Sequence, residues 1–261
     1  MSDYQLRFGG IARLYGNSQS EALQKAHFCV IGIGGVGSWV AEAFARNGIG
    51  QITLIDLDDL CITNINRQIH ALTSSVGQSK VDVMRDRIMQ INPECVVNTI
   101  EDFVTLENMA EIMSNGYDYV VDAIDSVNVK SAVIAHCKRN KIPLITIGGA
   151  GGQIDPSKIA IADLSQTYQD PLLAKVRNQL RREYNFPRNV KRKFSIDAVF
   201  STEQLRYPDS TGNVCHAKQA TDGAMRLDCS GGFGAATHVT ASFAFFAVGR
   251  AMEKYLKKAF N

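Results

Sequence analysis

Short runs of apolar residues alternate along the N-terminal part of the chain with stretches in which apolar residues recur at helical spacing. The short runs predict strands, and the stretches between them predict helices. The expected strands cover 28–31, 51–56, 95–100, 118–124 and 143–147, and the expected helices cover 38–46, about 78–90, 106–114 and 127–140. Such alternation is typical of parallel strands joined by right-handed crossovers, with ligands bound beyond the carboxyl ends of the strands. We therefore expect an α/β, Rossmann-like, mostly parallel doubly wound sheet.

The pattern changes after the glycine-rich segment 148–152. A strand is expected at 158–163 and a helix at 171–184, and a loop-rich region extends from there through 232. The expected organisation is a single domain, 1–261, with a nucleotide-binding core at 1–165 and a subregion at 166–261 that binds substrate, contributes to a dimer and ends in a helix.

The last helix is unusually apolar, because residues 231–249 contain no Asp, Glu, Lys or Arg. Glycines limit the helical part of this stretch to 235–249, a length of about 22 Å at the rise of an α-helix. A hydrocarbon core is about 30 Å thick, so the stretch is short for a membrane span. We expect a buried core or dimer-interface helix that continues into the basic stretch 250–258, in preference to peripheral or single-span membrane association.

Composition is that of an ordinary globular protein: 261 residues, of which 45% are hydrophobic and 21% charged. The six cysteines form no CxxC pair and no secretory leader is recognisable, which indicates reduced thiols in a cytoplasmic protein and disfavours a structural zinc site. The five histidines are scattered without metal-like spacing, so structural or surface roles are expected for them.

A glycine-rich turn between the first strand and the first helix carries the clearest chemical signal. Gly32, Gly34, Gly35 and Gly37 allow backbone N–H groups to approach a phosphate at a helix N-terminus, which stabilises anions. Asp56 ends the second strand about twenty residues later, where an acid typically bonds a ribose hydroxyl. By themselves these features fit NAD, FAD and ATP equally.

The residues that follow favour a triphosphate. They are Asp58, Asn64, Arg67, Gln68 and Lys80. Isolated cations of this kind are usually surface charges, but a leaving pyrophosphate develops charge that preorganised cations stabilise. Because Arg67 and Lys80 follow the glycine turn and the acid in this order, we expect both to act on ATP.

This ordered set of motifs over about residues 5–165 resembles the E1-like (ubiquitin-activating, ThiF- and MoeB-type) adenylating superfamily. The resemblance implies that the residues from Asp56 to Lys80 surround ATP. It also implies that Asp58 and Asp125, which follows the fourth strand, place a magnesium ion, with catalytic roles for Arg67, Lys80 and Asp125. Asp122 is expected to be structural.

Three further segments are similar to one branch of that superfamily, the branch that dehydrates threonylcarbamoyladenosine in tRNA: RFGGIARLYG near the N-terminus, 147–156, and 227–236. This resemblance implies that the threonyl carboxylate on adenosine 37 attacks the α-phosphorus of ATP. Pyrophosphate leaves, and a nitrogen of the same modification closes a ring with net loss of water. A homodimer is usual in this group, and a sulfur-acceptor protein of a cysteine desulfurase system is a further candidate partner.

Two details of the resemblance stay open. Cys229 lies in a Gly/Ser-rich segment from which a thiolate could reach the adenylate, or it is an incidental loop thiol. Related enzymes insert an arginine from the partner subunit into the ATP site, but this chain has Gly9-Gly10 at that place. Either Arg7 or Arg13 could substitute.

A strongly basic segment suggests the substrate. Between 175 and 193 there are eight basic residues and one acid, whereas the whole chain has a net charge of +2. Such a concentration of charge is typical of polyanion binding, with Tyr184 and Phe186 available for base stacking, although a solvated helix face has the same composition. The expected RNA-binding residues are Arg177, Arg181, Arg182, Arg188, Lys191, Arg192 and Lys193.

Other functions explain fewer of these features. An E1-like activator of a small ubiquitin-like or sulfur-carrier protein would account for the ATP motifs alone and needs a partner with a flexible Gly-Gly tail. A nicotinamide-dependent oxidoreductase would account only for the glycine turn. A pure RNA-binding module would leave the nucleotide site unexplained.

Overall fold

The computed structural model describes residues 2–209, 212–216 and 233–260. The helices are α1 (Asp3–Tyr15), α2 (Asn17–Lys25), α3 (Gly37–Arg46), α4 (Lys80–Ile91), α5 (Met109–Ile112), α6 (Val127–Arg139), α7 (Pro171–Glu183) and α8 (Thr237–Ala259), with short 3-10 turns at Ile62–Asn64, Pro156–Lys158 and Leu164–Gln166. The strands are β1 (His27–Ile31), β2 (Gln51–Ile55), β3 (Val96–Ile100), β4 (Tyr119–Asp122), β5 (Leu144–Ile147), β6 (Ile159–Asp163), β7 (Asp197–Ser201), β8 (Tyr207–Pro208) and β9 (Val214–Cys215).

Seven strands form one sheet in the order β3-β2-β1-β4-β5-β7-β6. Every pair is parallel except β6–β7, which confirms the expected mostly parallel, doubly wound α/β fold. The chain runs outward from β1 to β3 and then returns to β4 on the other side of β1. Loops diverge at such a reversal, which opens a crevice at the carboxyl ends of β1 and β4.

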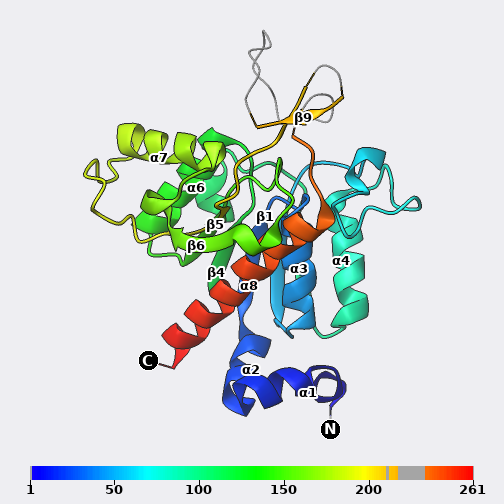
Figure 1. Cartoon of the computed structure of the whole chain (residues 1–261). Helices are drawn as coiled ribbons and strands as arrows, with labels where there is room; N and C mark the ends of the chain where they lie inside the picture. The colour runs from blue at the N-terminus through cyan, green and yellow to red at the C-terminus, as the bar shows by residue number, and fades with distance from the viewer. Residues whose placement is uncertain (1, 210–211, 217–232, 261) are drawn as a thin grey trace.

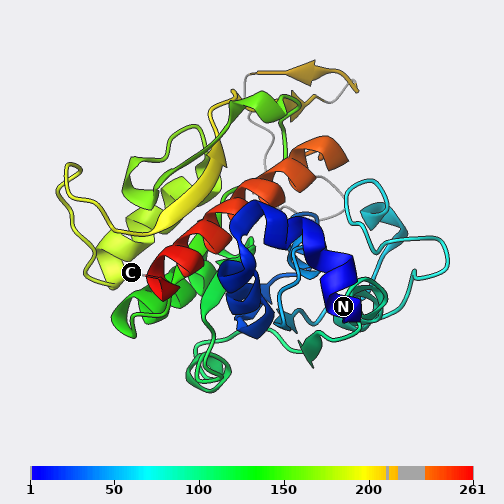
Figure 2. The ribbon, with the colours of Figure 1, turned by 90° about the horizontal axis from the view of Figure 1, so that it is seen from below.

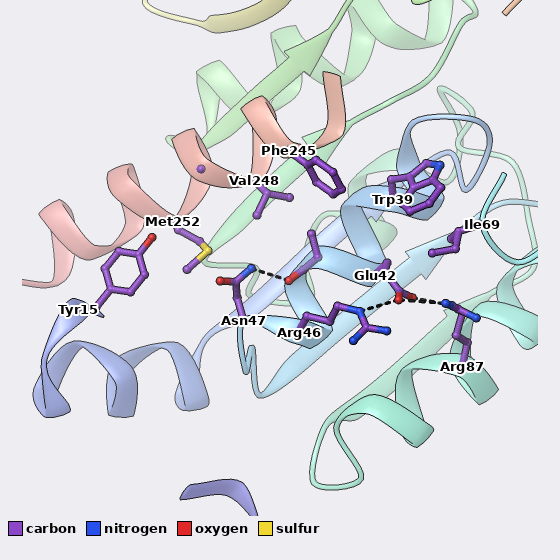
Figure 3. Close-up of a pocket in the computed structure, with 12 residues that line it drawn as sticks. Tyr15, Trp39, Glu42, Arg46, Asn47, Ile69, Arg87, Phe245, Val248 and Met252 are labelled. Carbon is purple, nitrogen blue, oxygen red and sulfur yellow. Dashed lines mark hydrogen bonds and ion pairs between the residues drawn. The ribbon is translucent and has the colours of Figure 1, made fainter. Parts of the chain in front are cut away.

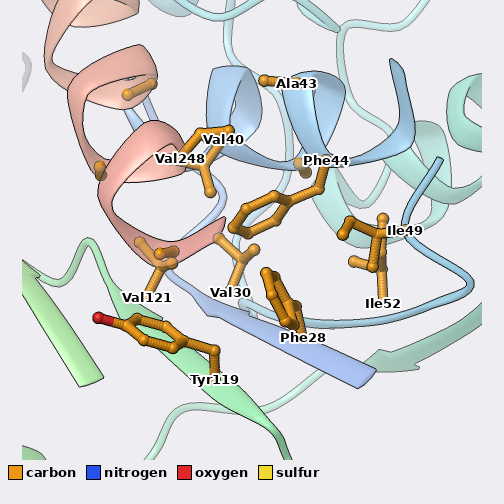
Figure 4. Packing of buried hydrophobic residues seen from close by; sticks show 14 of the residues in the cluster. Phe28, Val30, Val40, Ala43, Phe44, Ile49, Ile52, Tyr119, Val121 and Val248 are labelled. Carbon is orange, nitrogen blue, oxygen red and sulfur yellow. The ribbon is translucent and has the colours of Figure 1, made fainter. Parts of the chain in front are cut away.

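Helices cover both faces of the sheet (Figures 1 and 2). Side chains alternate along each strand, so Phe28 and Val30 of β1 join the core under α3, α4 and α8, whereas Cys29 and Ile31 join the core under α5, α6 and α7. In Figure 4 the rings of Phe28 and Phe44 meet edge to face, with centroids 4.9 Å apart. The nearly continuous apolar strands are therefore explained by burial on both sides.

The C-terminal helix α8 is longer than 235–249 and runs through the basic stretch, as expected. Its buried face, which includes Phe243, Ala247 and Met252, packs on the first core and against α3. Among the helices that the structure describes, none is long and apolar enough to cross a membrane. The expectation of a buried core helix is confirmed.

Several elements differ from the expected ones. The region expected to be loop-rich contains β7, which pairs with β5 and β6 and therefore places part of 166–261 in the main sheet. The helix expected at 106–114 is reduced to α5, because the Thr105 and Asn108 side chains form a turn just before it. The small β8–β9 hairpin was also unexpected.

Helices α1 and α2 were not predicted, although Tyr4, Phe8 and Ile11 of α1 recur at helical spacing. A capping box begins α1, in which Ser2 and Gln5 exchange hydrogen bonds. The pair is fixed to the core by distant contacts: the Tyr4 hydroxyl donates to the Gly48 carbonyl at 2.6 Å, and the Tyr255 hydroxyl donates to the Ala22 carbonyl at 3.0 Å. These helices are thus held by tertiary contacts.

Candidate active site

The glycine turn after β1 forms as expected, and its glycines serve different purposes. A Cβ on Gly37 would overlap the Gly32 carbonyl oxygen, and a Cβ on Gly32, whose φ is +86°, would lie 3.0 Å from the Ala123 carbonyl oxygen. Gly34 has no heavy atom within 4 Å of its Cβ position. Gly32 and Gly37 therefore close the turn against β1 and β4, whereas Gly34 faces open space at the N-terminus of α3.

This difference predicts opposite behaviour for two alanine variants. Gly37→Ala is expected to unfold the turn and lower the melting temperature markedly, because backbone atoms cannot move away cheaply. Gly34→Ala is expected to keep the stability of the wild type and to bind ATP about tenfold more weakly, which corresponds to 1.4 kcal/mol. Thermal melting and calorimetric titration with ATP measure both effects. Equal melting temperatures for the two variants would contradict this assignment.

Arg67 lies directly against the glycine turn. A Cβ on Gly35 would be 3.2 Å from the Cγ and Cδ atoms of Arg67, so glycine is needed there for the arginine to approach. The Arg67 Nη1 donates to the Thr63 carbonyl at 2.8 Å and to the Asn66 Oδ1 at 3.1 Å. The Trp39 indole donates to the Arg67 carbonyl at 3.0 Å. The guanidinium is consequently held beside the turn, and Trp39 and Asn66 are two contributors that sequence reasoning missed.

Lys80 joins the acids that follow β2. Its Nζ lies 2.7 Å from the Asp58 Oδ2 and 3.7 Å from the Asp56 Oδ1, and its side chain is only 7% exposed. Asp56 also accepts from the backbone N–H of Ile33 at 2.6 Å and of Asp58 at 2.9 Å. Burial raises the pKa of Asp56, and Lys80 opposes that shift. Asp56 therefore ties the glycine turn to the segment that holds Lys80.

Asn64 and Gln68 lie in the same turn as Arg67, and both side chains are buried. The buried Asn64 accepts a hydrogen bond from the Cys61 N–H at 3.0 Å, and its own carbonyl accepts from the N–H groups of Arg67 and Gln68. Gln68 is buried, and its Oε1 has no partner among the described residues. The observed role of Asn64 is to shape the 3-10 turn that presents Arg67.

The end of β4 contributes one exposed and one buried acid. Asp125 is exposed just before α6. Asp122 is fully buried, 2.9 Å from the Lys130 Nζ, and accepts from the Thr146 hydroxyl at 2.7 Å. Asp122 is thus structural, as expected. Within the described ranges no cluster of three or more His, Cys, Asp or Glu residues could hold a metal ion alone.

His70 forms part of the interior behind Lys80. Its two ring nitrogens have no hydrogen-bond partner among the described residues, and the side chain is buried. Burial, with smaller contributions from Lys80 and Arg87, lowers the pKa of His70 to about 3. The imidazole is therefore neutral at physiological pH, and adds no charge beside the lysine.

The segment that leads into α8 covers one side of the site. The Gly234 carbonyl accepts from the Gly152 N–H at 2.8 Å, and the Ala235 carbonyl accepts from the Asn66 Nδ2 at 2.8 Å. The glycine-rich loop after β5 and the turn carrying Arg67 are thereby joined through this segment. Cys229, which was expected to act here, lies outside the described residues.

The basic segment divides into anchored and solvent-facing cations. Arg181 donates to the Pro187 carbonyl at 3.3 Å and lies over the Phe194 ring, and Arg177 donates to the Thr167 hydroxyl. The exposed cations are Lys175, Arg182, Arg188, Lys191, Arg192 and Lys193.

The two aromatic residues of this segment are not free stacking platforms. Tyr184 and Phe186 are partly buried against the second core, and the Phe186 ring contacts the Phe194 ring at 5.0 Å. The loop after α7 folds back and uses both rings for packing, so the structure does not support the expectation that they stack on bases.

A separate groove of about 590 Å³ lies between α3 and α8 (Figure 3). Its apolar lining includes Trp39, Phe245 and Met252, and the buried Glu42 on its floor pairs with Arg46 and Arg87. None of the acids or cations of the nucleotide site lines it, so it is not the nucleotide site. Trp39 belongs to both regions, because its indole also bonds Arg67.

Comparison with known proteins agrees with this geometry. The chain is 58% identical over 256 residues to the tRNA threonylcarbamoyladenosine dehydratase of Escherichia coli, covering 98% of this chain and 96% of that protein. The solved structure of TcdA (CsdL) superposes with a TM-score of 0.91 at 56% identity and covers 99% of this chain and 97% of that one. A structure of the Escherichia coli dehydratase in complex with ATP gives a TM-score of 0.88 at 55% identity, covering 99% and 97%.

The model of the ThiF family matches residues 9–259, which include the glycine turn, Arg67, Lys80 and α8. This match extends over nearly the whole chain and includes both cores and the nucleotide site. The chain therefore belongs to the ThiF family.

Proposed function

We propose that this protein uses ATP to convert threonylcarbamoyladenosine at position 37 of tRNA to its cyclic form, with net loss of water. The observation that carries the proposal is the pair of preorganised cations: Arg67 lies against the glycine turn, and Lys80 is buried beside Asp56 and Asp58. Binding a dinucleotide needs neither cation, whereas a leaving pyrophosphate needs both. The similarity to the Escherichia coli dehydratase and to its complex with ATP supports the same reaction.

The reaction has two steps on one site. A carboxylate oxygen of the threonyl group forms a bond to the α-phosphorus, the bond to the bridging oxygen breaks, and pyrophosphate leaves. A nitrogen of the same modification then forms a bond to the activated carbonyl carbon and loses its proton while AMP departs. The residues of this chain orient the phosphates at the glycine turn and compensate the charge that develops on them.

Magnesium is expected to accompany ATP. This ion is usually held by one or two carboxylates together with phosphate oxygens, and it rarely needs a cage made entirely of protein. The exposed carboxylates of Asp58 and Asp125, which follow β2 and β4, fit that donor set. A bound magnesium ion would neutralise charge on the phosphates.

The basic segment supports RNA as the substrate carrier. Arg182, Arg188 and the run from Lys191 to Lys193 face solvent, and tRNA is a polyanion. Each phosphate that these cations neutralise releases counterions, so binding should weaken by about 0.7 to 0.9 log unit per log unit of salt for each contact.

Mass spectrometry of nucleosides tests the proposed function. The protein is incubated with ATP, magnesium and tRNA that carries threonylcarbamoyladenosine, and the RNA is then digested. The expected result is an ATP-dependent loss of one water from that nucleoside, abolished in Asp125→Ala. An unchanged nucleoside, together with ATP–pyrophosphate exchange that requires a Gly-Gly-tailed carrier protein, would instead assign the chain to protein activation.

For Cys229 we propose a thiolate that attacks the activated carbonyl before ring closure, so that AMP departs when the thioester forms and the thiolate departs when the nitrogen closes the ring. Its support is its position in the sequence, four residues before Phe233, whose ring lies against the glycine loop after β5. Cys229→Ser should then release pyrophosphate and stop at the adenylate, with little AMP and little cyclic nucleoside. A normal yield would reduce Cys229 to an incidental thiol. Transfer of sulfur to this thiol by a cysteine desulfurase would show as a persulfide in the intact mass.

A homodimer is the expected assembly. Phe245 and Phe246 of α8 are 50% and 41% exposed, and Phe245 lines the groove between α3 and α8, where a second subunit could cover it. Sedimentation analysis should give a dimer for the wild type and a monomer for Phe245→Glu. A monomeric wild type would remove any role for Arg7 or Arg13 in a neighbouring site.

A further inference from the structure

A second pocket lies at the N-terminal end of α7, beyond the carboxyl ends of β5 and β7. Its volume is about 360 Å³, within the range of small-molecule sites. The side chains that give it chemical character are Gln169, Asp170, Arg177, Gln204, Tyr207 and His216. The residues assigned to ATP above do not line it.

The wall of this pocket is built to be rigid. Asp170 is 4% exposed, and its carboxylate accepts from the N–H groups of Gly149 and Leu173, both at 2.9 Å. A Cβ on Gly148 would overlap this carboxylate, so glycine is required for the approach. The pocket wall is therefore attached to the loop that follows β5.

Arg177 is the unusual member of the pocket. It is half-buried, and burial followed by repulsion from Arg181 lowers the pKa of its guanidinium, while the Asp170 carboxylate opposes that shift. Its hydrogen-bond partner is the neutral Thr167 hydroxyl, and no ion pair within 4.0 Å joins it to a carboxylate in the described part of the chain. A partly desolvated cation with unused donors favours a ligand rich in hydrogen-bond acceptors.

The other lining groups narrow the class of ligand. The Gln169 and Gln204 amides donate and accept, as do the Tyr207 hydroxyl and the His216 imidazole, and this mixed set matches the edge of a nucleobase better than a simple anion. The Tyr207 ring packs against the Phe233 ring, with centroids 5.1 Å apart, which holds in place the phenol ring that lines the pocket.

The pocket connects the basic segment with the nucleotide site. Arg177 and Arg181 are one helical turn apart on α7, so the pocket continues the row of cations. On the other side, hydrogen bonds link the pocket to the nucleotide site. The Asp170 carboxylate accepts from the Gly149 N–H, and the Gly152 N–H of the same loop donates to the Gly234 carbonyl. The next carbonyl, that of Ala235, accepts from Asn66, which lies beside Arg67. A nucleotide in the pocket would thus lie between the RNA strand and ATP.

Because enzymes that modify a base take it out of the stack, we propose that this pocket receives the target adenosine and that Arg177 binds its acceptor atoms. The base enters from RNA lying along α7, and its threonylcarbamoyl group extends toward Arg67. This assignment rests on the proposed function and makes Arg177 a specificity residue for the base, distinct from the cations that bind the RNA backbone.

Binding of two anticodon stem-loop RNAs tests the inference, one with adenine at the target position and one abasic there. The wild type should prefer the adenine RNA about tenfold, since one good base contact is worth roughly 1–3 kcal/mol. Arg177→Gln should abolish this preference, so that the two RNAs bind with about equal affinity. The matched variant Arg182→Gln, on the same helix, should weaken both RNAs equally and keep the preference. If Arg177→Gln weakened the binding of both RNAs equally, the inference would be overturned, and Arg177 would be assigned to the cations that bind the RNA backbone.

A second variant separates this inference from the proposed function. The Gln204 side chain is exposed and lines the pocket. Gln204→Leu should raise the KM for modified tRNA about tenfold, with a similar kcat and unchanged ATP affinity. If the wild type removes water from the nucleoside but neither variant changes base preference or KM, only the pocket assignment fails. If the wild type removes no water, the proposed function fails first.

Discussion

Arg67→Ala is expected to slow ATP-dependent formation of the adenylate by about 10² to 10³-fold, the usual cost of losing one preorganised donor to a developing charge. The guanidinium lies against Gly35 and is fixed by the Thr63 carbonyl and the Asn66 side chain, so little reorganisation is needed when pyrophosphate leaves. Time courses of AMP and pyrophosphate release with modified tRNA measure the rate of adenylate formation.

Two controls make this result interpretable. The Trp39 indole bonds the backbone carbonyl of residue 67, so Arg67→Ala should keep the fold and melt like the wild type. Arg67→Lys retains the charge but loses the planar fork, and should recover only part of the rate. A rate within twofold of the wild type in Arg67→Ala would show that the arginine is not catalytic.

Lys130→Met is expected to destabilise the protein by about 3–5 kcal/mol, because it leaves the Asp122 carboxylate charged and unpaired in the interior. Both side chains are completely buried, and their charged atoms are 2.9 Å apart. Asp122 also accepts from the Thr146 hydroxyl and from the Ile124 N–H, so its carboxylate cannot easily turn away. Denaturant unfolding monitored by circular dichroism measures the loss.

A surface lysine on the same helix provides the comparison. Lys138→Met on α6 removes an exposed charge and should change the free energy of unfolding by less than about 0.5 kcal/mol. The double variant Asp122→Asn with Lys130→Met should regain part of the stability, because no unpaired charge is left. If Lys130→Met unfolds at the wild-type denaturant concentration, the pair makes no net contribution to stability.

The alternating core of the fold could be predicted because its signals are local. Strands β1, β2, β4 and β5 are continuous apolar runs, and each crossover helix has its own apolar face. Strand β7 was missed because it is only five residues long and follows a charged loop. Its pairing with β5 and β6, which are distant in sequence, is what makes it a strand. Helix α1 does carry a local signal, the capping box of Ser2 and Gln5, but the placement of α1 and α2 on the core depends on contacts of Tyr4 and Ala22 with distant residues.

The candidate site was predictable to the extent that its residues are close in sequence. The glycine turn, Asp56 and Arg67 follow one another along the chain, and the structure brings them together. Sequence reasoning could not foresee that Trp39 fixes the Arg67 backbone. It also did not foresee the packing of Tyr184 and Phe186, since an aromatic residue beside cations fits a stacking platform and a packed loop equally.

The sequence by itself determined the strand and helix periods, the turn that can approach a phosphate and the order of the groups expected to act on ATP, because hydrophobic periodicity and glycine geometry act over a few residues. Only the tertiary structure decided which charges are used internally. It paired Lys80 with Asp58 and Lys130 with Asp122, and it left Arg177 half-buried without an ion pair among the described residues. Burial sets the strength of each charge, and burial depends on contacts between segments that are far apart in the chain.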